Sequence, residues 1–575
     1  MILQELCAYY NRLRQDRESG IAPPGFSSQQ ISFAIVLDRQ GELVQIQDIR
    51  DTSGKKPRPV MMSVPEPVLR SVNVAANFLW DKTGYVLGAD MQGNPDRTKE
   101  TFQAFVARQH EIGDRVDDVG MNAVLAFLDS WSPGTADSIP QWEEVAGANV
   151  VFRLADEHRY IHERPALVDA WTGSWQSADG DDPSRGMCLI TGQERPIAKL
   201  HNRIKGVRDA QSSGASIVSF NLPSFCSYGK EQSYNAPIGR EAAFEYTTAL
   251  NRLLRFESRQ RIQIADATTV FWASAPTPME SFLGPIVDSG DPRFADSHTI
   301  GDVERYLRAV RSGRKPDWID ESVRFYILGL SPNASRIAVR FWYATTVDAL
   351  DRAIEQHFAD LEMVRQYDNQ EEFPCLRQLL LETAPLRRTE NINPNLAGAM
   401  TRSMLTGTPY PSFLLATLLN RIRADREIGY YRAALIKATL LRSARSRKRP
   451  MEVSEVLNES STDVAYRLGR LFAVLEKAQQ DALPGVNATI KDRYYGSASA
   501  TPAVVFPQLL RLNQHHTAKL EGGLRNARER LIQDISDEID HFPTHLPLES
   551  QGMFALGYYQ QRKALFTKRI EKEEE

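Results

Sequence analysis

The sequence predicts an α+β fold: a mixed N-terminal domain with antiparallel strands, followed by an all-helical C-terminal region that ends in a small helix bundle. Two observations support this prediction. Short apolar runs bounded by turn residues recur up to about Tyr343, and such runs are typical of strands. Beyond Thr345 they disappear, and long segments carry apolar residues at helical spacing instead.

The N-terminal stretch MILQELCAYYNRLRQD predicts an amphipathic helix. It is followed by ISFAIVL and LVQIQDI, two apolar runs on either side of DRQGE, whose glycine indicates the turn of a β-hairpin. The next segment, GKKPRPVMMSVPEP, is basic and rich in proline. We therefore expect it to be an exposed loop.

Further strand candidates follow, interrupted by helical segments such as REAAFEYTTALNRLLRF from Arg240. The last two strands are separated by SPNAS, which favours a tight turn between antiparallel neighbours. The candidates are MCLIT from Met187, ASIVSF from Ala215, TTVFWA from Thr268, VRFYILGL from Val323 and RIAVRFW from Arg336.

The C-terminal segments carry two apolar stripes that face a core, one from Val464 to Leu475 and one from Leu524 to Ile539. Short breaks at LPGVN, EGG and FPTHLP separate the helices and predict a small bundle. The chain is also too long for a single core, so several domains are expected. The predicted domains are 1–344 (α+β), 345–450 (a helical connection with a basic helix) and 451–575 (the bundle).

Composition excludes several classes of protein. The formal charge is −4, so binding to nucleic acid would require local clusters of positive charge. Cys7, Cys188, Cys226 and Cys375 lack CxxC spacing, which argues against a zinc site and against a disulfide framework. No run of about 18 apolar residues could cross a bilayer, and the N-terminus lacks the pattern of a secretory leader. We expect a cytoplasmic protein without a membrane partner.

The common catalytic motifs are absent: the sequence contains no GxxxxGK[ST], no GxGxxG after a strand, no GxSxG and no HExxH. Cys226 lies near His201 and Asp209 in the sequence, but a half-buried thiol is far more common than a nucleophile. We expect no catalytic residue, no metal site and no cofactor.

Positive charge gathers between Lys199 and Arg240, where six basic residues stand against Asp209 and Glu231. Between them, QSSGAS and SYGKEQSYN offer amides, hydroxyls and small residues that suit phosphate oxygens and groove edges. The alternative is an ordinary solvated loop.

A second basic segment predicts a helix that ends in RSRKRP, with apolar residues such as Leu415 and Leu418 facing a core. Its arginines would be free to bind a sugar-phosphate backbone, or would form salt bridges with a neighbouring domain. The basic residues are Arg421, Arg423, Arg426, Arg432, Lys437, Arg442, Arg445, Arg447, Lys448 and Arg449.

Taken together, six segments give the chain a resemblance to the large subunit of the type I-C CRISPR surveillance complex, or Cascade. They are ANFLWDKTGYVLG (76–88), CLITGQERPIAKLHNRIKGVRDAQSSGASIVSFN (188–221), SYGKEQSYNAPIG (227–239), AAFEYTTALNRLL (242–254), TVFWA (269–273) and AYRLGRLFAVLEKAQ (465–479). The match extends over nearly the whole chain.

The resemblance implies a non-catalytic subunit of antiviral defence that recognises the PAM, the short motif beside the target, in double-stranded DNA. Such a subunit promotes duplex opening and formation of the R-loop. Its expected partners are the 5′ end of the CRISPR RNA, the backbone, capping and small subunits of the complex, and a recruited helicase-nuclease.

The resemblance also implies which residues contact the PAM. Asn77, Lys82 and Tyr85 come from the first segment, with the alternatives that Asn77 caps a helix, Lys82 is solvated and Tyr85 packs beneath the hairpin. Arg70 and Asn73 are substitutes where the sequence departs from the family pattern. The remaining candidates are Lys205, Arg208, Gln211, Ser212 and Ser213 in one loop, and Lys230 and Gln232 in the next.

In families of this type, an internal start often yields the small subunit, and Met451 follows RSRKRP directly. The alternative is a linker methionine. The candidates for holding a displaced DNA strand are Arg421, Arg423, Arg442, Arg467, Arg470, Arg525 and Arg528, and Lys477 beside them; solvent-facing charges are the alternative.

Two other functions stay open at this stage. One is a metal-dependent nuclease that uses the carboxylates of Asp288, Asp291 and Asp296. The other is a purely structural bridge between subunits that does not read DNA.

Overall fold

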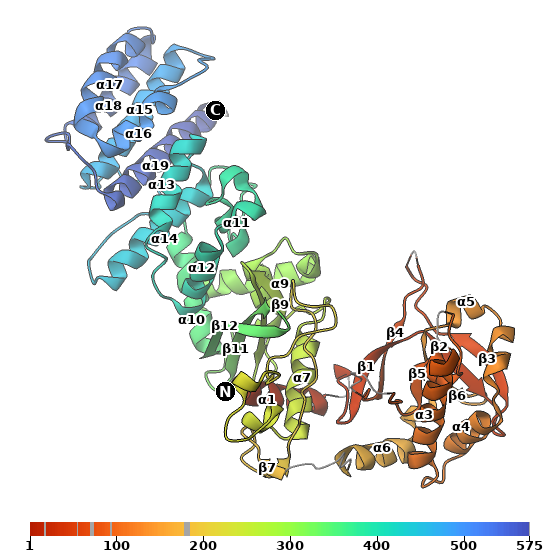
Figure 1. Cartoon of the computed structure of the whole chain (residues 1–575). Helices are drawn as coiled ribbons and strands as arrows, with labels where there is room; N and C mark the ends of the chain where they lie inside the picture. The colour runs from red at the N-terminus through yellow and green to blue at the C-terminus, as the bar shows by residue number, and fades with distance from the viewer. Residues whose placement is uncertain are drawn as a thin grey trace. The chain divides into compact units, whose positions relative to one another are not determined.

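The computed structural model describes residues 1–16, 19–54, 56–68, 74–91, 95–177, 185–314 and 316–573. The chain forms two compact units (Figure 1). The first unit comprises Met1–Ile204 and Ser213–Arg252, and the second comprises Lys205–Ser212 and Leu253–Glu575. The predicted ranges 1–344, 345–450 and 451–575 therefore do not coincide with the compact units and stay predictions.

The first unit is mixed α+β, with a sheet in the order β3-β2-β6-β5, a ribbon of β1 and β4, and a hairpin of β7 and β8. Its strands are β1 (Phe26–Ile31), β2 (Phe33–Leu37), β3 (Leu43–Asp48), β4 (Val60–Pro65), β5 (Trp80–Lys82), β6 (Asn149–Leu154), β7 (Arg185–Met187) and β8 (Glu194–Pro196). Its helices are α1 (Ile2–Gln15), α2 (Thr83–Val86), α3 (Pro95–Gly113), α4 (Val119–Ser130), α5 (Trp142–Val145), α6 (Pro165–Ser177) and α7 (Arg240–Leu253).

The predicted hairpin is confirmed as β2 and β3, which pair antiparallel. Strand β2 is buried along its whole length, which explains its unbroken apolar run. Gly41 in the turn has φ +90°, and a Cβ there would lie 2.6 Å from the carbonyl oxygen of Ala123 on α4. Only glycine fits this turn, because the conformation is left-handed and the backbone of α4 is adjacent.

The predicted N-terminal helix is α1, and it packs on α7. The rings of Tyr10 and Phe244 meet edge to face at 5.8 Å, and the Cys7 thiol lies 3.4 Å from the Ala242 carbonyl oxygen. Burial raises the pKa of the Cys7 thiol far above its ordinary value. This cysteine is therefore a core residue and not a nucleophile.

Three predictions for the first unit were wrong in detail. Residues 60–65, expected in an exposed loop, form β4, whose one proline, Pro65, falls at the end of an outer strand where no ladder hydrogen bond is needed. The strand expected from Met187 ends at that residue, since Cys188 begins a turn. The strand expected from Ala215 is reduced to a single β-bridge with Ile204.

The second unit begins with an antiparallel sheet in the order β12-β11-β10-β9. The strands are β9 (Arg261–Ile264), β10 (Ala267–Ala273), β11 (Arg324–Asn333) and β12 (Arg336–Thr346). The predicted strands at 268, 323 and 336, and the antiparallel turn between the last two, are confirmed. Phe271 and Phe325 stack at 6.1 Å on the face that belongs to the same hydrophobic core as the helices that follow.

Helices make up the rest of the second unit, as predicted (Figure 1). They are α8 (Met279–Val287), α9 (Ser297–Arg311), α10 (Val347–Leu361), α11 (Leu376–Leu381), α12 (Pro394–Thr406), α13 (Leu414–Asp425), α14 (Tyr430–Ser446), α15 (Val464–Ala482), α16 (Ile490–Ala500), α17 (Pro502–Thr517), α18 (Gly522–Ser536) and α19 (Leu548–Glu573). None of the helices in the described ranges is both long enough and apolar enough to cross a bilayer.

The C-terminal helices α15 to α19 form the predicted bundle around Phe472, whose ring contacts Tyr495, Phe506 and Phe554 from three other helices. Helices α15 and α19 approach until their backbones touch: a Cβ on Gly469 would collide with the Phe554 carbonyl. A second close approach lies at Gly557 of α19, against the backbone of α15.

Candidate nucleic-acid interface

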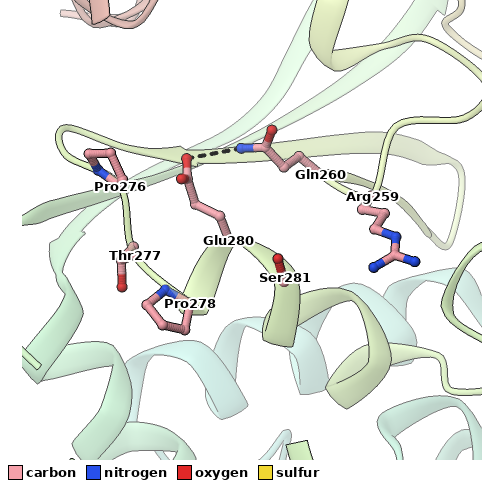
Figure 2. Close-up of a pocket in the computed structure, with 7 residues that line it drawn as sticks. All are labelled: Arg259, Gln260, Pro276, Thr277, Pro278, Glu280 and Ser281. Carbon is pink, nitrogen blue, oxygen red and sulfur yellow. Dashed lines mark hydrogen bonds between the residues drawn. The ribbon is translucent and has the colours of Figure 1, made fainter. Parts of the chain in front are cut away.

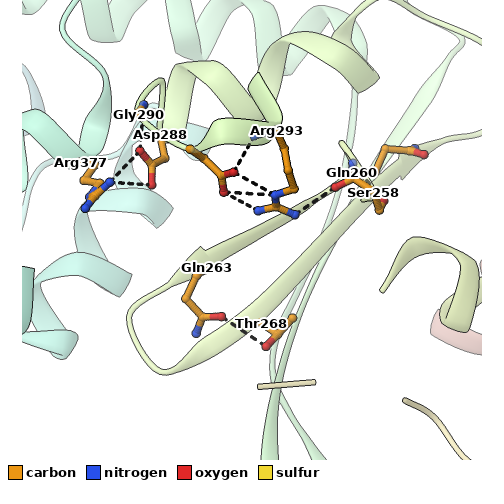
Figure 3. Close-up of polar contacts among 9 residues, drawn as sticks. Ser258, Gln260, Gln263, Thr268, Asp288, Gly290, Arg293 and Arg377 are labelled. Carbon is orange, nitrogen blue, oxygen red and sulfur yellow. Dashed lines mark hydrogen bonds and ion pairs between the residues drawn. The ribbon is translucent and has the colours of Figure 1, made fainter. Parts of the chain in front are cut away.

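Residues 205–212, called here the cationic loop, are fixed to strand β10 of the second unit. The backbone amide of Arg208 donates to Thr268 Oγ1 at 3.0 Å, and that hydroxyl lies 3.3 Å from Gln263 Oε1 (Figure 3). Gly206 has φ +89°, and a Cβ there would lie 2.5 Å from the Leu254 carbonyl oxygen. The loop backbone is therefore held by two contacts with buried structure.

The polar side chains of the cationic loop are exposed, whereas Val207 within it is buried. Lys205, Arg208, Gln211 and Ser212 are exposed, as is the adjacent Ser213. Arg208 forms an ion pair with Asp209 at 3.6 Å, but both side chains are more than 60% exposed, so the pair contributes little and can exchange for a phosphate. The predicted set thus lies on one short, anchored and polar segment.

The stem that precedes and follows the cationic loop belongs to the first unit. Ile204 and Ala215 exchange two backbone hydrogen bonds of 2.8 and 2.9 Å, and the Arg203 guanidinium donates to the Gly214 carbonyl at 3.1 Å. We expected a full strand behind the loop. The structure corrects this expectation. The Ile204–Ala215 bridge and the hydrogen bond from Arg208 to Thr268 of β10 support the loop instead.

Residues 227–235, called here the Asn235 loop, are organised by one side chain. Asn235 Oδ1 accepts the Ser227 amide at 2.8 Å, and its Nδ2 donates to the carbonyls of Lys230 and Gln232 at 2.9 and 3.0 Å. Lys230 is exposed and Gln232 is half-buried. Sequence reasoning selected these two residues but missed Tyr228, which is fully exposed at the tip; an aromatic residue followed by glycine was the available signal.

The earlier motif places its candidates differently. Asn77 is 3% exposed, and its Oδ1 accepts the Val68 amide at 3.0 Å, so this side chain is occupied inside the first unit and is not carried into the proposed DNA site. Lys82 is exposed at the start of α2, and Tyr85 is half-buried on that helix. Arg70 and Asn73 lie outside the described residues.

Each carboxylate considered for a nuclease is engaged by another group of the protein, as Figure 3 shows for Asp288 beside Arg377. Asp288 faces Arg377 at 3.3 Å, and Asp291 binds Arg293 through hydrogen bonds that lower the pKa of the carboxyl. Asp296 instead caps α9 by accepting the His298 amide. Among the described residues, no three metal-ligating side chains gather.

A surface pocket of about 480 Å³ lies beside β10 and the start of α8 (Figure 2). Its carboxylate, Glu280, accepts hydrogen bonds from the Gln260 amide at 3.0 Å and from the Ala273 backbone at 2.9 Å. Arg259 donates to Thr299 at 3.1 Å. These polar groups hold the fold together and do not form a pair of acid and nucleophile.

The Cys226 hypothesis also loses its base. His201 is 7% exposed, its Nδ1 lies 2.6 Å from the Tyr246 hydroxyl, and burial lowers the pKa of His201 to about 4. The Cys226 thiol lies 3.6 Å from the Leu222 carbonyl. Each of the two side chains thus contacts a different group: His201 contacts Tyr246, and Cys226 contacts Leu222.

In the described part of the chain, exposed cationic loops thus stand beside polar groups that serve the fold. The family model of the CRISPR-associated protein Cas_Csd1 matches residues 6–566. The chain belongs to this family. The predicted resemblance is thereby confirmed, since the family is that of the type I-C large subunit of Cascade. A comparison with curated proteins found no match.

In this Cas_Csd1 family member, the second basic segment is partly internal: Arg432, Lys437 and Arg442 are buried, whereas its C-terminal end is exposed. Arg442 is 1% exposed and binds Asp360 at 2.7 Å, while Arg432 is fully buried against Asp425 at 2.6 Å. Arg421 pairs with Asp425, and Arg423 donates to Gln551 at 2.5 Å. The salt-bridge alternative describes Arg421, Arg432 and Arg442, whereas the exposed Arg423 is bonded to an uncharged amide. Binding of a DNA strand by these arginines stays a prediction.

The arginines of the bundle are similarly engaged. Arg470 is 5% exposed and donates to Gln561 at 3.0 Å, Arg467 donates to the Ser461 carbonyl at 2.6 Å, and Arg528 binds Asp481 at 3.0 Å. Lys477 pairs with the same aspartate. Arg525 pairs with Glu529 at 2.9 Å but is half exposed. Of the four predicted bundle arginines, Arg525 is the one most accessible to a DNA strand.

Proposed function

We propose that this Cascade subunit reads the PAM in double-stranded DNA through the cationic loop. Lys205 and Arg208 bind phosphates and position the duplex, and Gln211, Ser212 and Ser213 contact base edges in the groove. Short amides and hydroxyls suit the minor groove, whose pattern of donors and acceptors is simple enough for few residues to read. Lys230 and Gln232 of the Asn235 loop, with Lys82 and Tyr85, are further proposed DNA contacts on the first unit.

The observation that carries this proposal is the hydrogen bond from the Arg208 backbone to Thr268. It fixes the loop through its main chain and leaves the side chains exposed to bind a ligand. A solvated loop without function would not need such an anchor, whereas a groove reader must keep its register on the duplex.

Membership of a family of Cascade subunits supports the wider role. We propose that PAM binding starts duplex opening and R-loop formation, and that the chain contacts the 5′ end of the CRISPR RNA with the backbone and capping subunits. Recruitment of a helicase-nuclease and separate production of the bundle from Met451 belong to the same proposal. The chain itself supplies no catalysis, and Arg525 is the candidate contact to the displaced strand.

The test is target binding by the assembled complex, using duplexes that carry the matched PAM or a mutated PAM, with and without magnesium. We expect binding to the matched duplex alone and no cutting by this chain. Equal binding to both duplexes would instead support a structural bridge. Cutting by the isolated chain would support the nuclease. Intact-mass measurement of the complex tests Met451, because a fragment that begins there would appear as a separate subunit.

A further inference from the structure

Tyr228 stands at the tip of the Asn235 loop with its side chain wholly in solvent, at 100% exposure. Aromatic side chains are usually at least half-buried in folded proteins, since their apolar rings gain free energy by leaving water. The preceding residue, Ser227, and the following one, Gly229, are also exposed. The ring therefore has no cover from its nearest neighbours in the chain.

The backbone that presents this ring is left-handed. Tyr228 has φ +54°, Gly229 has φ +68°, and Gln232 has φ +46°. Residues with a side chain rarely adopt such angles, and where they do, surrounding contacts hold them and the site is often functional. Two such residues within one short loop indicate that the tip conformation is enforced.

The enforcing contacts come from Asn235. Its side-chain amide joins the start of the loop, at the Ser227 amide, to the later turn, at the carbonyls of Lys230 and Gln232. Because three hydrogen bonds converge on one side chain, the loop is pre-organised before any ligand arrives. The hydrogen bonds of Asn235 thus fix the turn that carries Tyr228, so an ordered loop holds its ring in solvent.

We propose that Tyr228 stacks on an unpaired nucleobase of the target DNA beside the PAM. Every base has a π-face, so an exposed ring can stack on any sequence, and the exposed Lys230 two residues later provides a cation for the adjoining phosphate. A protein pocket would call for an apolar rim, whereas the residues beside Tyr228 in the chain are a serine and a glycine, followed by a lysine. The proposal rests on the proposed function and adds to it the residue that captures the opened strand.

The experiment places 2-aminopurine at the first unpaired position beside the PAM, on each DNA strand in turn, and measures its fluorescence on binding by the assembled complex. For wild type, we expect quenching that requires the matched PAM. Tyr228→Ala abolishes this quenching and weakens affinity for the duplex by about 5- to 150-fold. Tyr228→Phe retains both, because the ring and not the hydroxyl stacks.

Two further variants test the structural argument. Asn235→Ala removes the brace, so quenching falls while amide exchange in residues 227–235 accelerates. Tyr367→Ala removes another exposed tyrosine, at 61% exposure, and leaves quenching unchanged. Quenching that is equal in wild type and Tyr228→Ala overturns the inference, even where binding still depends on the PAM. Loss of a protein subunit from the purified Tyr228→Ala complex also overturns it and indicates a protein contact. Binding of wild type that ignores the PAM would instead refute the proposed function.

Discussion

The backbone amide of Arg208 donates a hydrogen bond of 3.0 Å to the hydroxyl of Thr268, a residue of β10 that is 1% exposed. The bond joins the middle of an exposed polar loop to the interior of a sheet. It uses the main chain of the arginine, so the guanidinium group stays available at the surface. The conformation of the cationic loop therefore depends on a buried side chain outside the loop.

Thr268→Val keeps the shape of the side chain but removes this acceptor. The Arg208 amide then lacks its acceptor. We expect the free energy that holds the loop on β10 to fall by about 1–3 kcal/mol. Amide exchange in residues 205–212 accelerates, and affinity for PAM duplexes falls. Thr268→Ser, which keeps the hydroxyl, is the control. Exchange rates in Thr268→Val that match those of Thr268→Ser would contradict the anchoring role.

Lys205→Ala combined with Arg208→Ala removes two phosphate contacts. Fewer counterions are then released on binding, so the slope of log K against log salt becomes shallower by about 0.9 per contact, or about 2 in total. Titrations of the assembled complex from low to moderate salt measure this slope. Arg305→Ala, which removes an exposed arginine paired with Asp302 on α9, should leave it unchanged. A slope that does not differ between the double variant and wild type would remove the phosphate-binding role.

Much of the fold could be read from local patterns. The apolar runs of β10 and β11 and the stripe of α15 were recognisable because these elements bury the residues that the sequence marks as apolar. The stripe of α18 is buried only in part, since Leu524 is 44% exposed. Strand β4 was missed because the prolines at its end and on either side of it resemble loop residues, and only pairing with β1 reveals the strand. The strand expected from Ala215 does not form, although its residues are apolar, because pairing there is limited to the bridge with Ile204.

The candidate site was predictable only in part. A run of basic residues signals charge but not where its partners lie, and Asp360 is more than 80 positions away from Arg442 in the sequence. Arg432 and Arg442 of α14 therefore looked free but are buried in salt bridges. The cationic loop was found because its neighbours are small and polar. Its anchor on Thr268 could not be found, since that contact joins residues 60 positions apart.

Gly469→Ala should disrupt the C-terminal bundle. The added methyl group meets the carbonyl of Phe554, and backbone atoms of α15 and α19 cannot move aside without opening the core around Phe472. We expect a loss of several kcal/mol, about 3 or more, in the stability of the bundle, measured by urea unfolding of the full chain. Gly496→Ala on α16 is the matched control: nothing lies within 4 Å, so helix propensity makes it neutral or stabilising by up to about 1 kcal/mol. Equal effects of the two substitutions would contradict the close helix contact.

Acid should weaken the first unit through its buried histidines. Burial lowers the pKa of His162 and of His201 to about 4 from the ordinary 6.5, so the folded state keeps both neutral while the unfolded state takes up protons. The stabilisation is complete above about pH 6.5 and is lost as the pH falls toward 4, by up to about 3 kcal/mol for each histidine.

Urea unfolding at pH 7 and at pH 5 measures this loss. Proteolytic fragments from the first unit report how much of that unit is unfolded. His201→Gln cannot titrate, so its stability should differ less between the two pH values than that of wild type, although it is lower at pH 7 because the bond to Tyr246 is changed. A variant with the full pH dependence of wild type would show that His201 does not carry the effect.

The central claim is that the cationic loop reads the PAM, and the most direct measurement is the ratio of affinities of the assembled complex for matched and PAM-mutated duplexes. The ratio is compared between wild type and a variant with Gln211→Ala and Ser212→Ala. We predict that the variant ratio falls by about tenfold or more, because base-edge contacts each contribute about 1–3 kcal/mol of discrimination. A ratio equal to that of wild type, with the variant folded and assembled, would contradict the account.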